Sequence, residues 1–270
     1  MAIDDRDFTL IRDFMLRTYG INLEKKRVLV EGRLTSLVDK NGFGSFHDYL
    51  SYAMSNPTLQ QEMVTRLTTN FTFFLREGIH YDFMVKTAIP SIQKKNPVKN
   101  NLKIWSAGCS SGDEVYTAAM FLREEALKSR RFPAFHFQAT DISDDALREA
   151  RAAVYADSSL KNLPPDFQSK YLRKTDEPGK WKVVPEISGA VTFSKLNLIE
   201  PFPLAFHNFD IIFCRNVMIY FTSDISRQLA KKYFNALNPG GYLFVGMSET
   251  IPAAEIGFKM IRPSIFYKER

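Results

Sequence analysis

The sequence predicts an α/β fold in which a small all-helical part precedes a mostly parallel, doubly wound sheet. Apolar residues recur at helical spacing through the N-terminal third of the chain. From residue 102 onward, short apolar runs alternate with helix-like segments, as is typical of strands joined by crossover helices. The alternation lapses between Ser158 and Leu196, where short strands around Gly and Pro turns predict a small β insertion.

The N-terminal part should contain at least three helices. The first should end at Gly20, because apolar residues keep helical spacing up to that glycine. A second helix is expected over residues 22–40, and a third begins at Pro57 with Asn56 as its N-cap. The polar stretch 93–101 then indicates a boundary.

This boundary divides the chain. We expect a helical domain over residues 1–85, a linker over 86–101 and a sheet domain over 102–270, with a β insertion at about 158–195. Within the sheet domain, strands are expected at 102–107, 135–140, 209–214, 242–247 and 265–268, and helices at 114–129, 143–155 and 225–237. Two short strands, 181–184 and 190–193, should make up the insertion.

Composition narrows the class of protein. Of 270 residues, 45% are apolar and 24% charged, and no apolar run is long enough to span a membrane. The acidic N-terminus is unlike a signal peptide, and two cysteines cannot build a disulfide framework, so a cytoplasmic protein is expected. The four histidines show no ligand spacing, which argues against a metal site. A net charge of +6 without a basic run is a weak sign of nucleic-acid binding.

The strongest local signal is residues 104–114, Ile-Trp-Ser-Ala-Gly-Cys-Ser-Ser-Gly-Asp-Glu. An apolar strand enters a loop of small residues and then a helix, so backbone can approach a ligand closely at Gly108. The spacing is neither that of a dinucleotide fingerprint nor that of a P-loop. A smaller nucleoside ligand, or only a tight turn, remains possible from this motif alone.

Two acidic residues strengthen the nucleoside interpretation. Asp141 ends the next strand, where a carboxylate can accept hydrogen bonds from both ribose hydroxyls. The alternatives are that Asp141 caps the following helix and that Glu114 is a favourable acid in a first helical turn. Taken together, the features favour S-adenosylmethionine, an adenosine ligand that needs no phosphate-binding loop.

A third cluster follows the apolar strand at 209–214. That strand delivers Arg215, Asn216 and Tyr220 to the same edge of the predicted sheet. Without the other motifs, the favoured interpretations are a surface ion pair for Arg215 and a core ring for Tyr220. The Asn-Pro-Pro-Tyr type of motif expected of enzymes that methylate nucleic-acid bases is absent.

These segments resemble a known family. Residues 68–77, Thr-Thr-Asn-Phe-Thr-Phe-Phe-Leu-Arg-Glu, resemble the signature that opens the cofactor site in the CheR family of chemotaxis receptor methyltransferases. Residues 105–114 are similar to the glycine loop of that family, and further blocks of the family are matched at 139–143, 197–198, 213–221 and 240–249. The chain departs from the pattern at Val115, where a proline is usual, and at Leu75, where an aromatic residue is usual.

The resemblance implies a fold and a site. It implies a Rossmann-like, S-adenosylmethionine-dependent methyltransferase domain with a small antiparallel β-subdomain insertion, preceded by a small all-helical domain. Carried over by motif, the residues that bind the cofactor are Asn70, Thr72, Arg76, Gly108, Glu114, Asp141, Asn197, Leu198, Arg215 and Asn216. Tyr220 is the catalytic candidate, which would hold the acceptor carboxylate near the methyl group.

The implied reaction methylates glutamate side chains of chemotaxis receptors, a signal-transduction role. Lys26, Arg33 and Lys40, spaced seven residues apart, form a basic stripe that could dock an acidic receptor helix, or could be only a solvated face. We expect a monomer with no nucleic-acid partner and no membrane insertion. The alternatives are a methyltransferase of nucleic acid or a small molecule, and a non-catalytic module that senses the cofactor.

Overall fold

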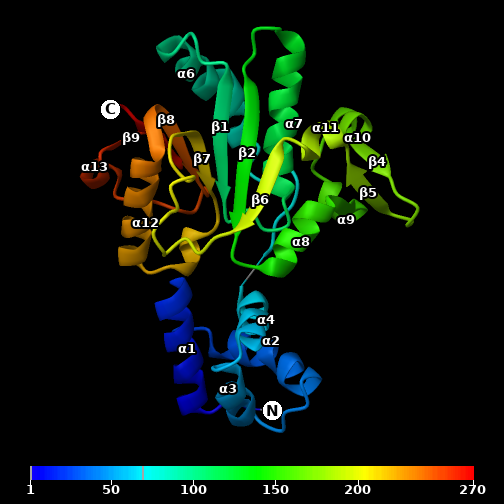
Figure 1. The fold of residues 1–270 in the computed structure, drawn as a ribbon, viewed down its shortest axis with the longest axis vertical. Coiled ribbons are helices and arrows are strands. Elements are labelled where there is room, and N and C mark those ends of the chain that lie inside the picture. The colour runs from blue at the N-terminus through cyan, green and yellow to red at the C-terminus, as the bar shows by residue number, and fades with distance from the viewer. Residues whose placement is uncertain (1, 69) are drawn as a thin grey trace.

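The computed structural model describes residues 2–68 and 70–270, and it places a group of short helices below a larger α/β part (Figure 1). The lower helices are α1 (Asp5–Tyr19), α2 (Arg27–Lys40), α3 (Phe46–Ala53) and α4 (Pro57–Leu67). They bury their own apolar core, in which Ile11, Val30 and Met63 are fully enclosed. The predicted helical domain is therefore a separately packed unit.

Local signals set the ends of these helices as the sequence predicts. Gly20 has φ +74° and its N–H donates to the Leu16 carbonyl at 3.0 Å, which ends α1. The Asn56 side chain accepts hydrogen bonds from the first turn of α4. Helix α2 begins five residues later than predicted, because Ile21 pairs instead with Phe221 of the α/β part.

The large sheet has seven strands in the order β6-β2-β1-β7-β8-β10-β9. The first five are parallel to their neighbours, whereas β10 is antiparallel to both β8 and β9. Their bounds are β1 (Asn101–Ala107), β2 (Ala134–Asp141), β6 (Val191–Lys195), β7 (Phe209–Cys214), β8 (Leu237–Val245), β9 (Phe258–Arg262) and β10 (Ile265–Lys268). The strand order reverses between β1 and β7, and ligands of such sheets bind at this switch point.

Helices cover the sheet as the alternating pattern predicts. They are α7 (Asp113–Lys128), α8 (Asp144–Ala152), α12 (Ser223–Ala236) and the single turn α13 (Ala253–Ile256). Ser143 is the N-cap of α8, since its hydroxyl accepts the Ala146 N–H at 3.3 Å. Helix α8 ends at Ala152, shorter than predicted, because Ala153 has φ +53° and the chain turns into a strand.

The β insertion is also present but its limits differ from the prediction. A second sheet has the antiparallel order β3-β5-β4, formed by β3 (Val154–Ala156), β4 (Leu172–Lys174) and β5 (Lys180–Val183). Three short helices complete the region, namely α9 (Asp157–Leu160), α10 (Pro165–Tyr171) and α11 (Pro185–Ser188). The predicted strand at 190–193 does not join this sheet: it is β6, which pairs with β2 at the edge of the large sheet.

The prediction of a linker over residues 86–101 is wrong for most of that segment, which is helical. Residues 79–95 form consecutive helical segments, α5 (Ile79–Phe83), the π-helical turn η1 (Met84–Ala88) and α6 (Ile89–Lys95). Tyr81, Met84 and Ile89 are fully buried in the same core as the strands of the large sheet. The residues up to 95 thus pack with the α/β part, and the chain passes between the two parts near residue 70, as Figure 1 shows.

Candidate cofactor and acceptor site

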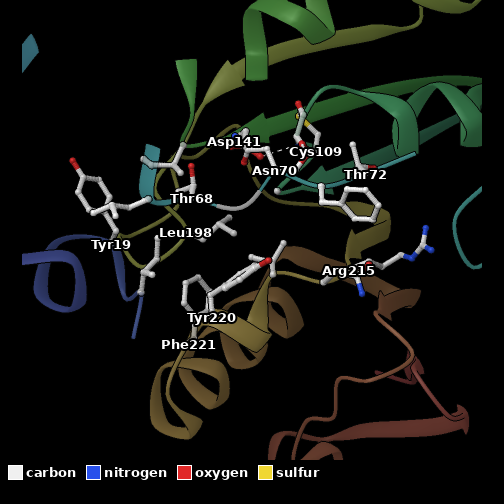
Figure 2. A pocket seen from close by; sticks show the side chains of 18 of the residues that line it. Tyr19, Thr68, Asn70, Thr72, Cys109, Asp141, Leu198, Arg215, Tyr220 and Phe221 are labelled. Carbon is white, nitrogen blue, oxygen red and sulfur yellow. Dashed lines mark hydrogen bonds between the residues drawn. The ribbon is translucent and has the colours of Figure 1, made fainter. Parts of the chain in front are cut away.

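A cavity of about 240 Å³ lies at the carboxyl ends of β1, β2 and β7, where the α/β part meets the helical domain. Figure 2 shows side chains of both parts around it, with Tyr19 from the end of α1 and Asp141 from the end of β2. All ten residues predicted to bind the cofactor line this cavity, and Tyr220 lines it too. The helical domain therefore completes the site, which the sequence motifs did not indicate.

The loop after β1 brings backbone to the cavity wall. Gly108 has φ +84°, and its N–H donates to the Thr140 carbonyl at 2.8 Å. A Cβ atom at this position would lie 2.4 Å from Cγ2 of Val217, in the loop after β7. Only glycine allows the two loops to approach this closely, so the glycine predicted to meet a ligand also shapes the site.

Asp141 faces the cavity from the tip of β2. Its Oδ2 accepts the Ser110 N–H at 2.8 Å and its Oδ1 accepts the Ser143 N–H at 2.9 Å. Burial raises the pKa of Asp141, while these backbone donors act in the opposite direction. Since Ser143 is the cap of α8, the alternative of Asp141 as the N-cap does not hold.

Glu114 and Arg215 belong to one buried network. Glu114 Oε1 accepts the Ser106 hydroxyl at 2.8 Å, and its Oε2 lies 3.2 Å from Arg215 Nη1. The guanidinium also donates to the Tyr81 hydroxyl at 2.9 Å and to the Arg76 carbonyl, and its Nη2 and Nε both donate to Glu77 Oε2, at 3.1 and 3.3 Å. All five N–H groups of Arg215 are thus used within the protein.

This network changes the expected role of Arg215. Its side chain is 1% exposed and in Figure 2 extends away from the centre of the cavity. A direct hydrogen bond to a cofactor would require one of the internal bonds to break. Burial raises the pKa of Glu114 and Arg215 opposes that rise, so the guanidinium supports Glu114 rather than replacing it as a ligand.

The connector after α4 supplies the third wall. The Asn70 carbonyl accepts the Ser110 hydroxyl at 2.9 Å, which holds the connector against the glycine loop. Thr72 lies farther along the same wall (Figure 2). Arg76 donates to the Phe71 carbonyl at 2.9 Å and is among the residues that line the cavity. Thr69, part of the motif that carried the family resemblance, lies outside the described residues.

Asn197 and Leu198 form the wall next to the helical domain. The Asn197 side-chain amide donates to the Thr18 carbonyl at 2.7 Å and so ties this loop to the end of α1. Leu198 is buried and presents its apolar side chain to the cavity, while its carbonyl accepts a hydrogen bond from Lys232. Asn197 therefore fastens the two parts together as well as lining the site.

Tyr220 lies in the 3-10 turn η2 (Met218–Tyr220) after β7, and its hydroxyl points into the cavity in Figure 2. The Tyr220 carbonyl accepts the Asn22 N–H at 2.8 Å, a second fastening between the parts. Asn216, on the same loop, has φ +58° and donates its side-chain amide to Glu77 at 3.3 Å. This loop thus contributes both Asn216 and Tyr220 to the cavity lining.

The basic stripe is only partly available at the surface. Arg33 Nη1 donates to the Leu67 and Thr68 carbonyls at 3.0 and 3.2 Å, at the end of α4. Lys40 lies 3.6 Å from Glu62, and Lys26 is exposed at the rim of the cavity. Lys26 is the residue before the first turn of α2, and the other two residues of the predicted stripe have partners inside the helical domain.

Two carboxylates at the site were not singled out from the sequence. Glu77 pairs with Arg215, and Glu249, buried after β8, accepts hydrogen bonds from the Asn216 loop. Both fall inside the segments that carried the family resemblance, but neither has a local pattern that signals its role. Over residues 2–68 and 70–270, no cluster of His, Cys, Asp or Glu could hold a metal ion, and no helix could cross a membrane.

The residues present fit S-adenosylmethionine. The glycine-lined wall admits a ligand close to backbone, Asp141 stands where ribose hydroxyls would bind, and the cavity has no phosphate-binding lysine on its loop. Fold and site together define an S-adenosylmethionine-dependent methyltransferase. Residues 70–266 match the model of the CheR methyltransferase S-adenosylmethionine-binding domain, and residues 6–68 match the all-alpha domain of the same family. The chain belongs to the CheR methyltransferase family.

Two chemotaxis protein methyltransferases agree with this assignment. The chain is 40% identical to a chemotaxis protein methyltransferase of Borreliella burgdorferi, covering 93% of this chain and 89% of the relative. It is 33% identical to chemotaxis protein methyltransferase 1 of Pseudomonas aeruginosa, and the match covers the whole of both chains. A magnesium protoporphyrin IX methyltransferase from Synechocystis PCC 6803 aligns over 99% of both chains, with 13% identity and a TM-score of 0.40.

Proposed function

We propose that this protein transfers a methyl group from S-adenosylmethionine to glutamate side-chain carboxylates of chemotaxis receptors, in the cytoplasm. One observation carries the proposal: a single cavity is lined both by the residues that would hold the cofactor and by Tyr220, which can hold an acceptor. The names of the relatives support the chemotactic role. Glutamate as the acceptor agrees with the family resemblance.

Different residues of the cavity would bind different groups of the cofactor. Asp141 would accept hydrogen bonds from the ribose, the apolar side chain of Leu198 would pack on the base, and the free donors of Arg76 would bind the carboxylate. Glu114, held by Ser106 and Arg215, would accept from the ammonium group. When bound, S-adenosylmethionine supplies an activated methyl group on a sulfonium sulfur.

The protein needs to orient the acceptor rather than to deprotonate it. A glutamate carboxyl has an unperturbed pKa of about 4.3 and is ionised at neutral pH, so no general base is required. The Tyr220 hydroxyl can donate one hydrogen bond to that carboxylate and fix its direction of approach. Apolar walls at Val217 and Phe221 would exclude water from the nucleophile.

The helical domain would present the receptor to this site. Receptor methylation helices are expected to be rich in glutamate, and Lys26 is exposed at the rim where such a helix would arrive. Arg33 and Lys40 would contribute longer-range attraction from α2, although both have internal partners. The alternative role of these three residues is that of a solvated helix face without a partner.

The test incubates the protein with labelled S-adenosylmethionine and receptor cytoplasmic fragments. We expect base-labile label on glutamate, and none on fragments whose candidate glutamates are replaced by glutamine. Label on nucleic acid instead would favour another methyltransferase class, and cofactor binding without transfer would favour a sensing module. Either result would overturn the proposed reaction.

A further inference from the structure

One buried carboxylate holds the loop that carries Tyr220. Glu249 is 8% exposed, and its Oε2 accepts the N–H groups of Asn216 at 2.8 Å and of Gly246 at 2.6 Å. Its Oε1 accepts the N–H of Ile219 at 3.1 Å. A single side chain thus binds three backbone donors from two separate segments of the chain.

These donors need such a partner because they lie beyond the strands. Strand β7 ends at Cys214 and β8 at Val245, so the N–H groups that follow have no neighbouring strand to bond. Buried backbone donors without a partner are costly, and Glu249 satisfies them. Among the described residues Glu249 has no basic side chain within ion-pair distance, in contrast to Glu77, which pairs with Arg215.

Close packing at Gly246 leaves this arrangement little freedom. A Cβ atom on Gly246 would lie 2.7 Å from Asn216 Nδ2, 2.8 Å from Glu249 Oε2 and 2.9 Å from the Asn216 backbone nitrogen. On its other side Asn216 donates to Glu77, at 3.3 Å. The Asn216 loop is therefore held by two carboxylates, Glu77, which precedes β1 in the chain, and Glu249, which follows β8.

We propose that Glu249 is a positioning residue for methyl transfer, which sets the place of Tyr220 by fixing the backbone at Asn216 and Ile219. It does not line the cavity, so it acts only through the loop. The Tyr220 carbonyl is anchored to Asn22 of the helical domain, which leaves Glu249 to fix the other end of the turn. The catalytic part of this proposal rests on the proposed function.

The test compares Glu249→Gln with Glu255→Gln, a matched control on the exposed turn α13. An amide at position 249 turns one oxygen into a donor group that faces a backbone N–H. In Glu249→Gln we expect kcat to fall about tenfold to a hundredfold, the range for a misplaced catalytic group. KM for S-adenosylmethionine should change by a smaller factor than kcat, since Asp141, Glu114 and Leu198 are untouched, and the control should match the parent protein.

A double-mutant cycle shows whether the effect passes through Tyr220. If Glu249 acts by placing that hydroxyl, Tyr220→Phe should cost less than about twofold in the Glu249→Gln background, although it is damaging alone. Equal costs in both backgrounds would overturn the proposal. A purely structural role for Glu249 would lower thermal stability and leave this cycle additive.

Hydrogen exchange tests the loop without any turnover. In the cofactor-free protein, the amides of Asn216, Ile219 and Gly246 should exchange at least about tenfold faster in Glu249→Gln than in the parent, and unchanged exchange would overturn the proposal. Glu249→Asp, which keeps the charge on a shorter side chain, should show the same pattern to a smaller degree. This measurement is independent of whether receptors are the acceptor, so failure of the proposed function would leave it standing.

Discussion

Replacing Gly108 with alanine tests the geometry of the site directly. The added Cβ would lie 2.4 Å from Val217 Cγ2, well inside contact distance, and the backbone at φ +84° disfavours any side chain. Both effects act at the seam between the glycine loop and the loop after β7. The substitution should therefore weaken the fold and the cofactor site together.

The size of the effect follows from these two terms. A left-handed backbone costs a non-glycine residue about 1–2 kcal/mol, and overpacking costs about 1–3 kcal/mol. A loss of about 3 kcal/mol in the free energy of unfolding corresponds to a fall of about 6–12 °C in Tm for a chain of this size class. Because Val217 lines the cavity and must move, S-adenosylmethionine affinity should fall about tenfold, or about 1.4 kcal/mol.

Thermal unfolding and calorimetric titration with S-adenosylmethionine measure both quantities. The matched control is Gly32→Ala, in α2, where an added Cβ meets nothing within 4 Å and alanine should stabilise the helix by about 1 kcal/mol. Adding Val217→Ala to Gly108→Ala should recover the part of the loss caused by the clash. An unchanged Tm and cofactor Kd for Gly108→Ala would refute the close approach of the two loops.

Three further outcomes are expected. Tyr220→Phe should lower kcat by about tenfold or more while leaving the Kd for S-adenosylmethionine within about twofold, and full turnover would exclude its proposed role. Lys26→Glu should reduce receptor methylation at low salt, with the difference from the parent shrinking as salt is raised; indifference to salt would contradict docking at the rim. Burial raises the pKa of Asp113 to about 6, so the folded state binds a proton more tightly than the unfolded chain, and this residue's contribution to stability should fall as pH rises from about 4 to about 6. Relative to Asp113→Asn, the parent protein should therefore lose about 2 kcal/mol of unfolding free energy across that window, measured by denaturant titration, and parallel pH profiles would contradict it.

Much of the fold could be read from local patterns. The strands at β1, β2 and β7 are short apolar runs followed by polar or small residues, and the helices between them carry ordinary capping signals. The glycine loop follows β1 and Asp141 ends β2, and both line the cavity in the structure. The carboxyl ends of neighbouring parallel strands lie at the same edge of a sheet. Residues that end or directly follow such strands can therefore be predicted to lie close together from their positions in the sequence.

Other features depended on contacts that no local pattern encodes. The run at 190–193 could have paired in either sheet, and its packing beside β2 made it part of the large one. The segment at 79–95 falls partly within the predicted linker because it contains Pro90 and runs into the polar stretch 93–101, yet its apolar residues are buried in the core of the large sheet. The segment packs with the α/β part because its apolar side chains are buried there, and helix propensity alone does not predict that contact.

The sequence by itself thus predicted most of the helices and strands around the cavity, placed a small-residue loop and an acid at the ends of two strands, and carried the resemblance to the family to which the chain belongs. Only the tertiary structure showed that the end of α1 lines the cavity. It also showed that every N–H group of Arg215 is hydrogen-bonded within the protein, and that Glu249 accepts hydrogen bonds from the loop that carries Tyr220. The physical reason is the same in each case. Hydrophobic periodicity indicates local helices and strands and their buried faces. Hydrogen bonds and packing between residues far apart in the chain depend instead on how those elements are arranged in space.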